Sequence, residues 1–427
     1  MDAHNSALYE RAKTRLKMRL LAMLETIPDE RRKSLERREL QEHLRQGYRQ
    51  LPEEFRTLSL GETGEAQLFE EVIDDVLGRG PLEPFLKDQT ITEIMVNGPH
   101  EIFIERNGKL IRTPATFHDT THLMGVLERM LSEAGLTVNA ADPVCDASLP
   151  DGLRLNVIIP PLVLNGPTAT IRRKLRDWTL DEYVAGGAFS LEAAEFLQAC
   201  VKAKTNLIIS GGTSTGKTTL VSILSSLIPP DDRIITIENV AELDLQGREH
   251  WVRLVGRAPN LQGRGEISLR VLVKNALRMR PDRMILGEAR GGEALDVVQA
   301  MHSGHDGVMT VLHANSPEAA LERLETLMMM SGLDLPSNVC RMQIATAVDL
   351  VIHLARFADG SRRVSSISQV MGADHGAFQL EEVFMFQVDG FSPDGALQGA
   401  LRYTGVKPKA LTKFQLNNVP VPSWVRA

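Results

Sequence analysis

The stretch IISGGTSTGKTTLVSIL, residues 208–224, joins two apolar segments through a run of Gly, Thr, Ser and Lys. Gly211, four further residues and then Gly216, Lys217 and Thr218 form the pattern of a phosphate-binding loop, or P-loop. The apolar run before the loop predicts a buried strand, and the segment after it predicts a helix that ends before two prolines. Strand, loop and helix therefore follow in the order that phosphate binding requires.

This loop predicts binding of a nucleoside triphosphate together with Mg²⁺. Glycines let backbone N–H groups turn toward an anion without a clashing Cβ, and the helix N-terminus adds its positive dipole. We expect Lys217 to reach the β- and γ-phosphates and the Thr218 hydroxyl to ligate Mg²⁺. The alternative is a glycine-rich turn without a ligand, which the order of strand, loop and helix disfavours. The expected nucleotide-binding residues are Gly211, Gly212, Thr213, Ser214, Thr215, Gly216, Lys217, Thr218 and Thr219.

Length and composition narrow the class of protein. A chain of 427 residues predicts two or three domains. Its cysteines, Cys145, Cys200 and Cys340, lie far apart and indicate neither a disulfide framework nor a zinc knuckle, which suits a reducing cytoplasm. We find no signal peptide and no run of about 18 apolar residues. The net charge of −7 disfavours a dedicated nucleic-acid binder, although it allows a local basic channel.

The first part of the chain predicts two different units. Residues 1–62 are rich in Leu, Met, Arg, Glu and Gln, which favours a helical N-terminal arm. In RAKTRLKMRLLAMLE, residues 11–25, cations alternate with Leu and Met; this fits packing against the same or a neighbouring subunit or, alternatively, an anionic membrane surface. Residues 63–175 predict a smaller α+β domain. Its expected strands cover 90–96, 101–105, 153–159 and 168–173, and its helix about 120–134.

The second part predicts an α/β domain. Residues 176–190 are expected to be a hinge or linker, with two glycines near its end. Residues 191–427 alternate helices with apolar strands, which indicates a largely parallel sheet covered by helices. Beyond residue 360, short strands and Asp-Gly turns predict a small, β-rich antiparallel addition. The expected strands of the main sheet cover 207–210, 233–238, 284–288, 308–312 and 350–354.

Acidic residues at two strand ends are candidates for the chemistry beside the loop. Glu288 follows a buried strand in RMILGEARGGEAL, and an acid there can lie by Mg²⁺ or polarise the attacking water. Glu238 ends another apolar strand in RIITIENVAEL, and Glu242 lies one helical turn later. Two acids beside one metal–phosphate centre would divide Mg²⁺ ligation and water activation between them. The sequence leaves open which acid does which, and a solvated strand end is the alternative for each.

A histidine-rich segment, MHSGHDGVMTVLHANS, follows at residues 301–316. His305 lies in a Gly-flanked turn, and His313 ends a predicted strand. We expect a histidine in this place to sense the γ-phosphate and pass its presence to a neighbouring element. One alternative is a pair of hydrogen-bonded structural histidines. Another is a metal site of His302, His305, Asp306 and His313, which lacks a Cys or Glu at zinc-like spacing.

In this order and at these spacings, the elements resemble the ATPases of type II and type IV secretion systems, which carry a P-loop, an aspartate box, a Walker B segment and a histidine box. GEARGGEALDVVQAMHSGHDGVMTVLHANSP is similar to the branch that drives tight-adherence (Flp/Tad) pilus assembly, the CpaF-like ATPases. GRGPLEPFLKD, ITEIMVNGP, IFIERNGKL, PDGLRLNVIIPPL and ATIRRK resemble the N-terminal domain of that branch. The resemblance extends from about residue 65 to 385 and implies a RecA-like motor domain after a smaller N-terminal domain.

The resemblance also implies roles for the candidate residues. The implied catalytic set is Lys217, Glu238, Glu288, His305 and His313, with Glu242 in the aspartate box and Mg²⁺ held through the nucleotide by Thr218 and Glu288. Arg154 and Arg172 match N-terminal-domain arginines that contact the nucleotide, where a cation would offset phosphoryl charge. Candidates for bridging to a neighbouring subunit are Arg278, Arg280 and Arg290. Asn239 departs from the pattern, because an Asp usually follows the Glu of the aspartate box.

The implied protein is a cytoplasmic homohexamer at the inner face of the cytoplasmic membrane. It hydrolyses ATP, binds no nucleic acid, associates with the membrane through partners, and drives a polytopic inner-membrane platform protein of a Tad/Flp pilus by interdomain motion. One alternative is a DNA-translocating ATPase of the conjugation type, for which a basic channel with interleaved aromatics would be expected. Another is a nucleotide-dependent scaffold or switch, which the intact Lys217, Glu238 and Glu288 disfavour.

Overall fold

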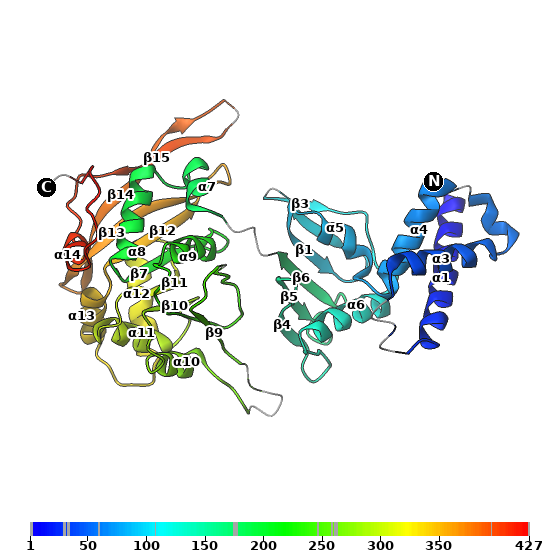
Figure 1. Cartoon of the computed structure of the whole chain (residues 1–427), viewed down its shortest axis with the longest axis horizontal. Coiled ribbons are helices and arrows are strands. Elements are labelled where there is room, and N and C mark those ends of the chain that lie inside the picture. Colours follow the sequence, from blue (N-terminus) through cyan, green and yellow to red (C-terminus); the bar gives the residue numbers. More distant parts are fainter. Residues whose placement is uncertain are drawn as a thin grey trace. The chain divides into compact units, whose positions relative to one another are not determined.

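The computed structural model has two compact units, Met1–Lys174 and Leu175–Ala427 (Figure 1). The first combines helices with a six-stranded sheet, and the second is built on a nine-stranded sheet. No helix among the described residues is both long enough and apolar enough to cross a membrane. The structure describes residues 3–28, 31, 35–58, 60–106, 108–173, 178–245, 247–257, 259, 264–393 and 395–425.

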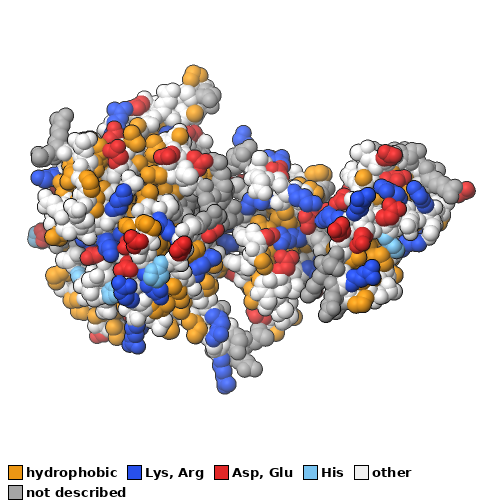
Figure 2. All heavy atoms as spheres, viewed as in Figure 1, with side chains coloured by type: hydrophobic (Ala, Val, Ile, Leu, Met, Phe, Trp, Pro, Cys, Tyr) orange, Lys and Arg blue, Asp and Glu red, His pale blue; other side chains and the backbone are white. Residues whose placement is uncertain are grey.

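The N-terminal arm is a helical bundle. It consists of α1 (Ala3–Glu25), α3 (Arg37–Arg49), the 3₁₀ helix η1 (Glu53–Leu58) and α4 (Gly61–Val76). α1 buries a stripe of apolar residues four apart, from Leu8 to Leu24, against the other helices. Its Lys13 pairs with Glu71 at 3.2 Å and with Asp75 at 3.4 Å. Blue and red side chains are interspersed over these helices in Figure 2. These contacts favour an arm that packs within its own subunit.

The sheet of the first unit is antiparallel, with the strand order β3-β2-β1-β6-β5-β4. Two short turns, η2 (Gly80–Leu82) and α5 (Glu83–Lys87), precede β1 (Ile91–Asn97), β2 (Ile102–Arg106), β3 (Lys109–Arg112), α6 (Thr120–Glu133), β4 (Val144–Ser148), β5 (Leu153–Ile158) and β6 (Thr168–Arg173). Alternate residues of β1, β5 and β6 are buried with α6 in one core, so the opposite face of the sheet carries their polar side chains.

The second unit confirms the predicted α/β class. Its strand order is β15-β14-β13-β12-β7-β11-β10-β8-β9, parallel from β12 to β9. The parallel strands are β7 (Leu207–Gly211), β8 (Ile234–Glu238), β9 (Trp251–Val255), β10 (Arg283–Leu286), β11 (Met309–His313) and β12 (Leu350–Arg356). The helices are α7 (Leu180–Ala185), α8 (Leu191–Lys202), α9 (Lys217–Ser226), α10 (Leu269–Ala276), α11 (Glu293–His302), α12 (Pro317–Met329), α13 (Ser337–Ala347) and α14 (Leu411–Leu416). An apolar core lies on each face of the sheet. One core includes residues of α8 and α9, and the other includes residues of α10 to α13.

The C-terminal strands differ from the small addition expected from the sequence. β13 (Arg362–Asp374), β14 (Ala377–Phe391) and β15 (Leu397–Tyr403) continue the main sheet, because β13 pairs antiparallel with the whole of β12. At the other side of the sheet, β9 is an edge strand that the sequence did not predict. Its partly exposed residues lack the apolar run that marks a buried strand.

The segment expected to be a hinge also contains regular structure. Within 176–190, Thr179 and Glu182 form a capping box that begins α7. Tyr183 on this helix is 9 % exposed and packs against Trp178 and Phe189. The residues from 178 onward therefore belong to the core of the second unit, because aromatic packing and the capping box fix them there.

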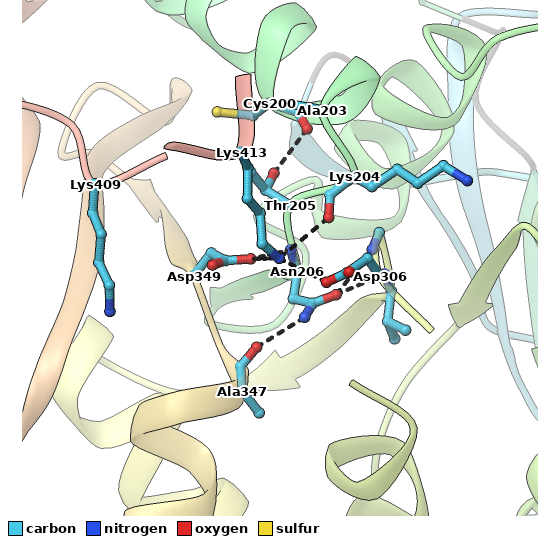
Figure 3. A network of polar contacts seen from close by, with 12 residues as sticks. Cys200, Ala203, Lys204, Thr205, Asn206, Asp306, Ala347, Asp349, Lys409 and Lys413 are labelled. Atoms are coloured by element: carbon cyan, nitrogen blue, oxygen red, sulfur yellow. Dashed lines mark hydrogen bonds and ion pairs between the residues drawn. The ribbon is translucent and has the colours of Figure 1, made fainter. Parts of the chain in front are cut away.

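Asn206 holds the N-terminal edge of the parallel strands together (Figure 3). Its side chain is buried; Nδ2 donates to the Ala347 carbonyl at 2.9 Å, and Oδ1 accepts from the N–H groups of Gly307 and Val308 at 3.0 and 3.1 Å. Its backbone N–H donates to Asp349 at 2.7 Å. The Asn206 side chain, just before β7, thus forms hydrogen bonds with backbone groups of the residues that precede β11 and β12.

Lys413 of α14 completes this edge. Its Nζ lies 2.7 Å from Asp349 and 2.8 Å from Asp306, and donates to the carbonyl of Lys204 at 3.4 Å (Figure 3). The C-terminal helix is thereby tied to the starts of three strands. We call Asn206, Asp306, Asp349 and Lys413 the basal clamp.

Candidate active site

The predicted P-loop lies at the opposite edge, where β7 ends and α9 begins. Gly211 has φ +153°, and a Cβ there would lie 2.5 Å from the carbonyl oxygen of Leu354. Gly216, just before α9, has φ +95°. Residues other than glycine rarely adopt these backbone conformations, so the loop requires both glycines. Thr215 closes the turn by donating from Oγ1 to the Gly212 carbonyl at 3.0 Å.

Lys217 folds into this loop. Its side chain is buried, and Nζ donates to the carbonyls of Gly211 at 3.1 Å and Gly212 at 2.5 Å. Burial lowers the pKa of Lys217, and the charge of Glu288 opposes this shift. A buried ammonium held by neutral carbonyls is a group that an anion stabilises strongly. The arrangement therefore suits phosphate binding.

Glu238 ends β8 in a buried position. Its Oε1 accepts from the backbone N–H groups of Glu242 and Leu243, both at 2.9 Å, whereas its buried Oε2 has no hydrogen-bond partner among the residues that the structure describes. Burial raises the pKa of Glu238, and the charge of Glu242 adds to this effect. One carboxylate oxygen is thus held by backbone N–H groups, while the other is buried from solvent. Asn239, the departure from the aspartate-box pattern, is exposed beside it.

Glu288 and His313 form a pair next to Lys217. His313 ends β11, and its Nε2 lies 3.3 Å from Oε1 of Glu288, while Arg290 contacts Oε2 at 2.8 Å. Burial lowers the pKa of His313, and the charge of Lys217 lowers it further. In contrast to Glu238, both oxygens of Glu288 have partners. Lys217, Glu288 and His313 thus form one electrostatic cluster at the C-terminal ends of parallel strands.

The donor set at this edge fits Mg²⁺ together with a nucleotide. Thr218 and Thr219 lie in the first turn of α9, both partly buried. A hydroxyl and carboxylate oxygens are the hard ligands that Mg²⁺ prefers, and nucleotide phosphates usually supply the remaining ligands. The unpartnered Oε2 of Glu238 agrees with a site that receives a polar reactant.

The structure does not bring His305 to this cluster. His305 precedes β11, so the strand, which spans about 16 Å, separates it from His313. Its Nδ1 lies 3.2 Å from the hydroxyl of Ser303. Arg278 and Arg280 are exposed and precede β10, so they too lie toward the N-terminal edge. Among the described residues, no group of three or more His, Cys, Asp or Glu is arranged to hold a metal ion by itself.

Arg154 and Arg172 belong to the first unit. They lie directly opposite each other on β5 and β6, so both side chains occupy the same face of the sheet. Glu93 on β1 accepts from Nε of Arg172 at 3.0 Å. Two like charges in directly opposed positions lower the stability of a sheet, so this arginine pair is an unfavourable arrangement for the sheet itself.

Sequence reasoning missed one polar contact at the P-loop. Ser210 immediately precedes Gly211, and its Oγ lies 2.8 Å from Nδ1 of His353 on the neighbouring β12. A histidine within the apolar run LVIHLA was the available signal, but its partner is 143 residues away.

The comparisons with known proteins agree with this geometry. The family model described as "Type II/IV secretion system protein" matches residues 75–388. A putative conjugal transfer protein of Mycobacterium tuberculosis is 34 % identical over 331 residues, which cover 75 % of this chain and 92 % of the relative. The VirB11 ATPase from the Brucella suis type IV secretion system, solved in complex with sulphate, is 31 % identical and covers 68 % of this chain and 92 % of its own, with a TM-score of 0.38.

A third comparison concerns the fold alone. The Yersinia pseudotuberculosis ATPase DotB is 16 % identical, with a TM-score of 0.50, and the match covers 68 % of this chain and 77 % of that one. It supports the α/β class with a preceding N-terminal domain. The family match covers most of the chain and includes the P-loop, both acidic strand ends and the histidine segment. The protein therefore belongs to the type II/IV secretion system protein family, and it is an ATP hydrolase.

Proposed function

We propose that this motor powers assembly of a Tad/Flp-type pilus. It acts as a cytoplasmic homohexamer at the inner face of the cytoplasmic membrane, through a polytopic platform protein. The observation that carries the proposal is the cluster of Lys217, Glu288 and His313 beside the P-loop, with Glu238 at the end of β8, the strand next to β10. The resemblance of residues 287–317 to the CpaF-like branch supports the choice of pilus.

The chemistry divides among these residues. Lys217 and the N–H groups of the loop bind the β- and γ-phosphates of ATP. Glu238 is the better candidate for general base, because its Oε2 has no hydrogen-bond partner within the described part of the chain and its raised pKa favours accepting a proton from water. Thr218 and Glu288 would hold Mg²⁺, which neutralises phosphate charge when bound. His313, which is paired with Glu288, senses the γ-phosphate.

Coupling to motion depends on Arg154 and Arg172. Two opposed cations interact more favourably with a triphosphate than with a diphosphate, and this difference in affinity shifts the first unit relative to the second. Fluorescent labels on the two units provide the test. We expect different label distances with a non-hydrolysable ATP analogue and with ADP, and no such difference after Arg154→Ala plus Arg172→Ala. Equal distances in every nucleotide state of the parent would refute the coupling.

A conjugation-type motor that moves DNA is the second candidate, favoured by the name of the mycobacterial relative. The rate of ATP hydrolysis with and without single-stranded DNA separates the two. The pilus motor should be unaffected by DNA, whereas a DNA translocase should be stimulated by it.

A strain test addresses the pilus itself. Chromosomal Lys217→Ala should remove surface fibres and leave plasmid transfer at its parental frequency. Lys202→Ala, an exposed lysine at the end of α8, is the matched control and should leave fibres intact. Loss of transfer with normal piliation would instead support the conjugation-type motor.

A further inference from the structure

His353 is an unusual residue for its place in the fold. It lies within β12, one of the buried parallel strands, among Ile352, Leu354 and other apolar residues. It is 7 % exposed, and a polar ring in such a strand costs free energy unless it is hydrogen-bonded. A residue of this kind is usually a satisfied core histidine, so its partners decide whether it does more.

The first partner is the residue that leads into the P-loop. β12 pairs in parallel with β7, and the register places His353 beside Ser210 and Leu354 beside Gly211. Nδ1 of His353 and Oγ of Ser210 are 2.8 Å apart, and the Ser210 side chain is fully buried. The ring therefore fixes the last side chain before the loop turns at Gly211.

The second partner is the segment after His313. Burial lowers the pKa of the His353 ring, whereas the charge of Glu318 and the nearby backbone of Asn315 favour its charged form. The same segment reaches the loop directly, because the N–H of Ala314 donates to the carbonyl of Gly211 at 3.4 Å. The imidazole thus contacts the entry of the P-loop and lies near the chain that carries His313.

We propose that His353 is a positioning residue for ATP hydrolysis, which holds Ser210 and residues 313–315 in a single arrangement. It contacts no phosphate itself. Through its two partners it keeps the His313–Glu288 pair in register with the P-loop. This inference rests on the proposed roles of Lys217 and His313.

The test compares steady-state ATP hydrolysis of three variants of the full chain with that of the parent. Ser210→Ala and His353→Leu each remove the 2.8 Å contact, and their double variant removes both ends. We expect kcat to fall about tenfold or more in each, the effect of one lost hydrogen bond on a transition state, with KM for ATP changed less than about twofold. The double variant should be no worse than the single ones, because both remove the same interaction.

Ser366→Ala is the matched control. Ser366 lies beside His353 on the other side, in the register of β13, and is similarly buried. It should leave kcat unchanged. His353→Gln, which keeps a polar side chain, should recover part of the activity that His353→Leu loses.

Two results separate this inference from the proposed site. If Ser210→Ala and His353→Leu lower only the melting temperature while kcat matches the Ser366→Ala control, His353 is purely structural and the inference is wrong. If His353→Leu does not fold, Ser210→Ala decides by the same criterion. Should Lys217→Ala retain full activity, the proposed site itself fails, whatever His353 does.

Discussion

The N-terminal and the C-terminal ends of the parallel strands form two opposite edges of the nine-stranded sheet. The buried polar groups at these two edges differ in how they are hydrogen-bonded. At the N-terminal edge, the basal clamp pairs the buried amide of Asn206 with three backbone groups and Lys413 with two carboxylates. At the C-terminal edge, one buried oxygen of Glu238 has no hydrogen-bond partner among the described residues, and Lys217 is buried against neutral carbonyls. Within the described residues, the basal clamp is therefore satisfied by the protein alone, whereas Glu238 is not.

This difference indicates how the fold divides stability from function. A buried polar group without a partner costs free energy, which a reactant of matching chemistry recovers when it binds. Substitutions at the C-terminal edge should therefore damage activity without loss of stability, and substitutions in the basal clamp should do the reverse. The three tryptophans, Trp178, Trp251 and Trp424, all lie in the second unit, so their fluorescence reports on the unfolding of that unit alone.

Lys217→Ala should have the largest effect. Loss of the cation that we propose binds the transferring phosphoryl group should lower kcat by about 10²–10³-fold or more, because no other buried cation is placed in the loop among the described residues. Release of inorganic phosphate from ATP provides the measurement. Lys413→Met, a lysine removed from the opposite edge, should keep the parental rate per folded molecule. Equal losses in both variants would contradict the division between the edges.

Glu238→Gln should lower kcat by about 10²-fold, because an amide retains the hydrogen bonds from the N–H groups of Glu242 and Leu243 but cannot accept a proton from water. The same variant should be about 1 kcal/mol more stable near neutral pH, since it removes a buried unpaired charge. Hydrolysis rates and urea unfolding followed by tryptophan fluorescence give the two values. A variant that loses activity and stability together would refute this reading of the site.

The stability gain of Glu238→Gln should depend on pH. Because burial raises the pKa of Glu238 above its usual 4.5, the folded parent binds this proton more tightly than the unfolded chain does. The associated stability is present below pH 4.5 and is lost as the pH rises through the folded-state pKa. The parent and the variant should therefore unfold at similar urea concentrations in acid and diverge toward neutral pH.

The contrast between the edges also explains what the sequence could predict. The P-loop, Glu238, Glu288 and His313 are local signals at strand ends, and the parallel α/β order brings strand ends to one edge. The pairs Ser210–His353 and Asn206–Ala347 join residues 143 and 141 positions apart, which no local pattern reveals. Even so, the strand between His305 and His313 already implies, from the sequence, that these histidines lie at opposite edges.

Asn206→Ala should destabilise the second unit by about 2 kcal/mol or more. It leaves the Ala347 carbonyl and the N–H groups of Gly307 and Val308 without their partner in a buried place, and each such loss carries a desolvation cost. The urea midpoint should fall, while kcat per folded molecule stays near the parental value. Asn417→Ala is the matched control, because this exposed amide on the same edge donates to the carbonyls of Ala203 and Lys413. An equal loss in both variants would mean that Asn206 holds the edge no better than a surface amide.

Lys413→Met should have the smallest effect, about 1 kcal/mol, because its carboxylate partners are partly exposed and screened by solvent. Burial alone would lower the pKa of Lys413, but Asp349 and Asp306 outweigh it and raise the pKa above its usual 10.5. The lysine's contribution is then fully present below pH 10.5 and is lost as the pH rises through the folded-state pKa. Unfolding midpoints of the parent and Lys413→Met should accordingly differ at pH 8 and converge at alkaline pH. If the difference in unfolding midpoint between the parent and Lys413→Met stays constant to the highest pH measured, Lys413 stabilises this edge by packing rather than by charge.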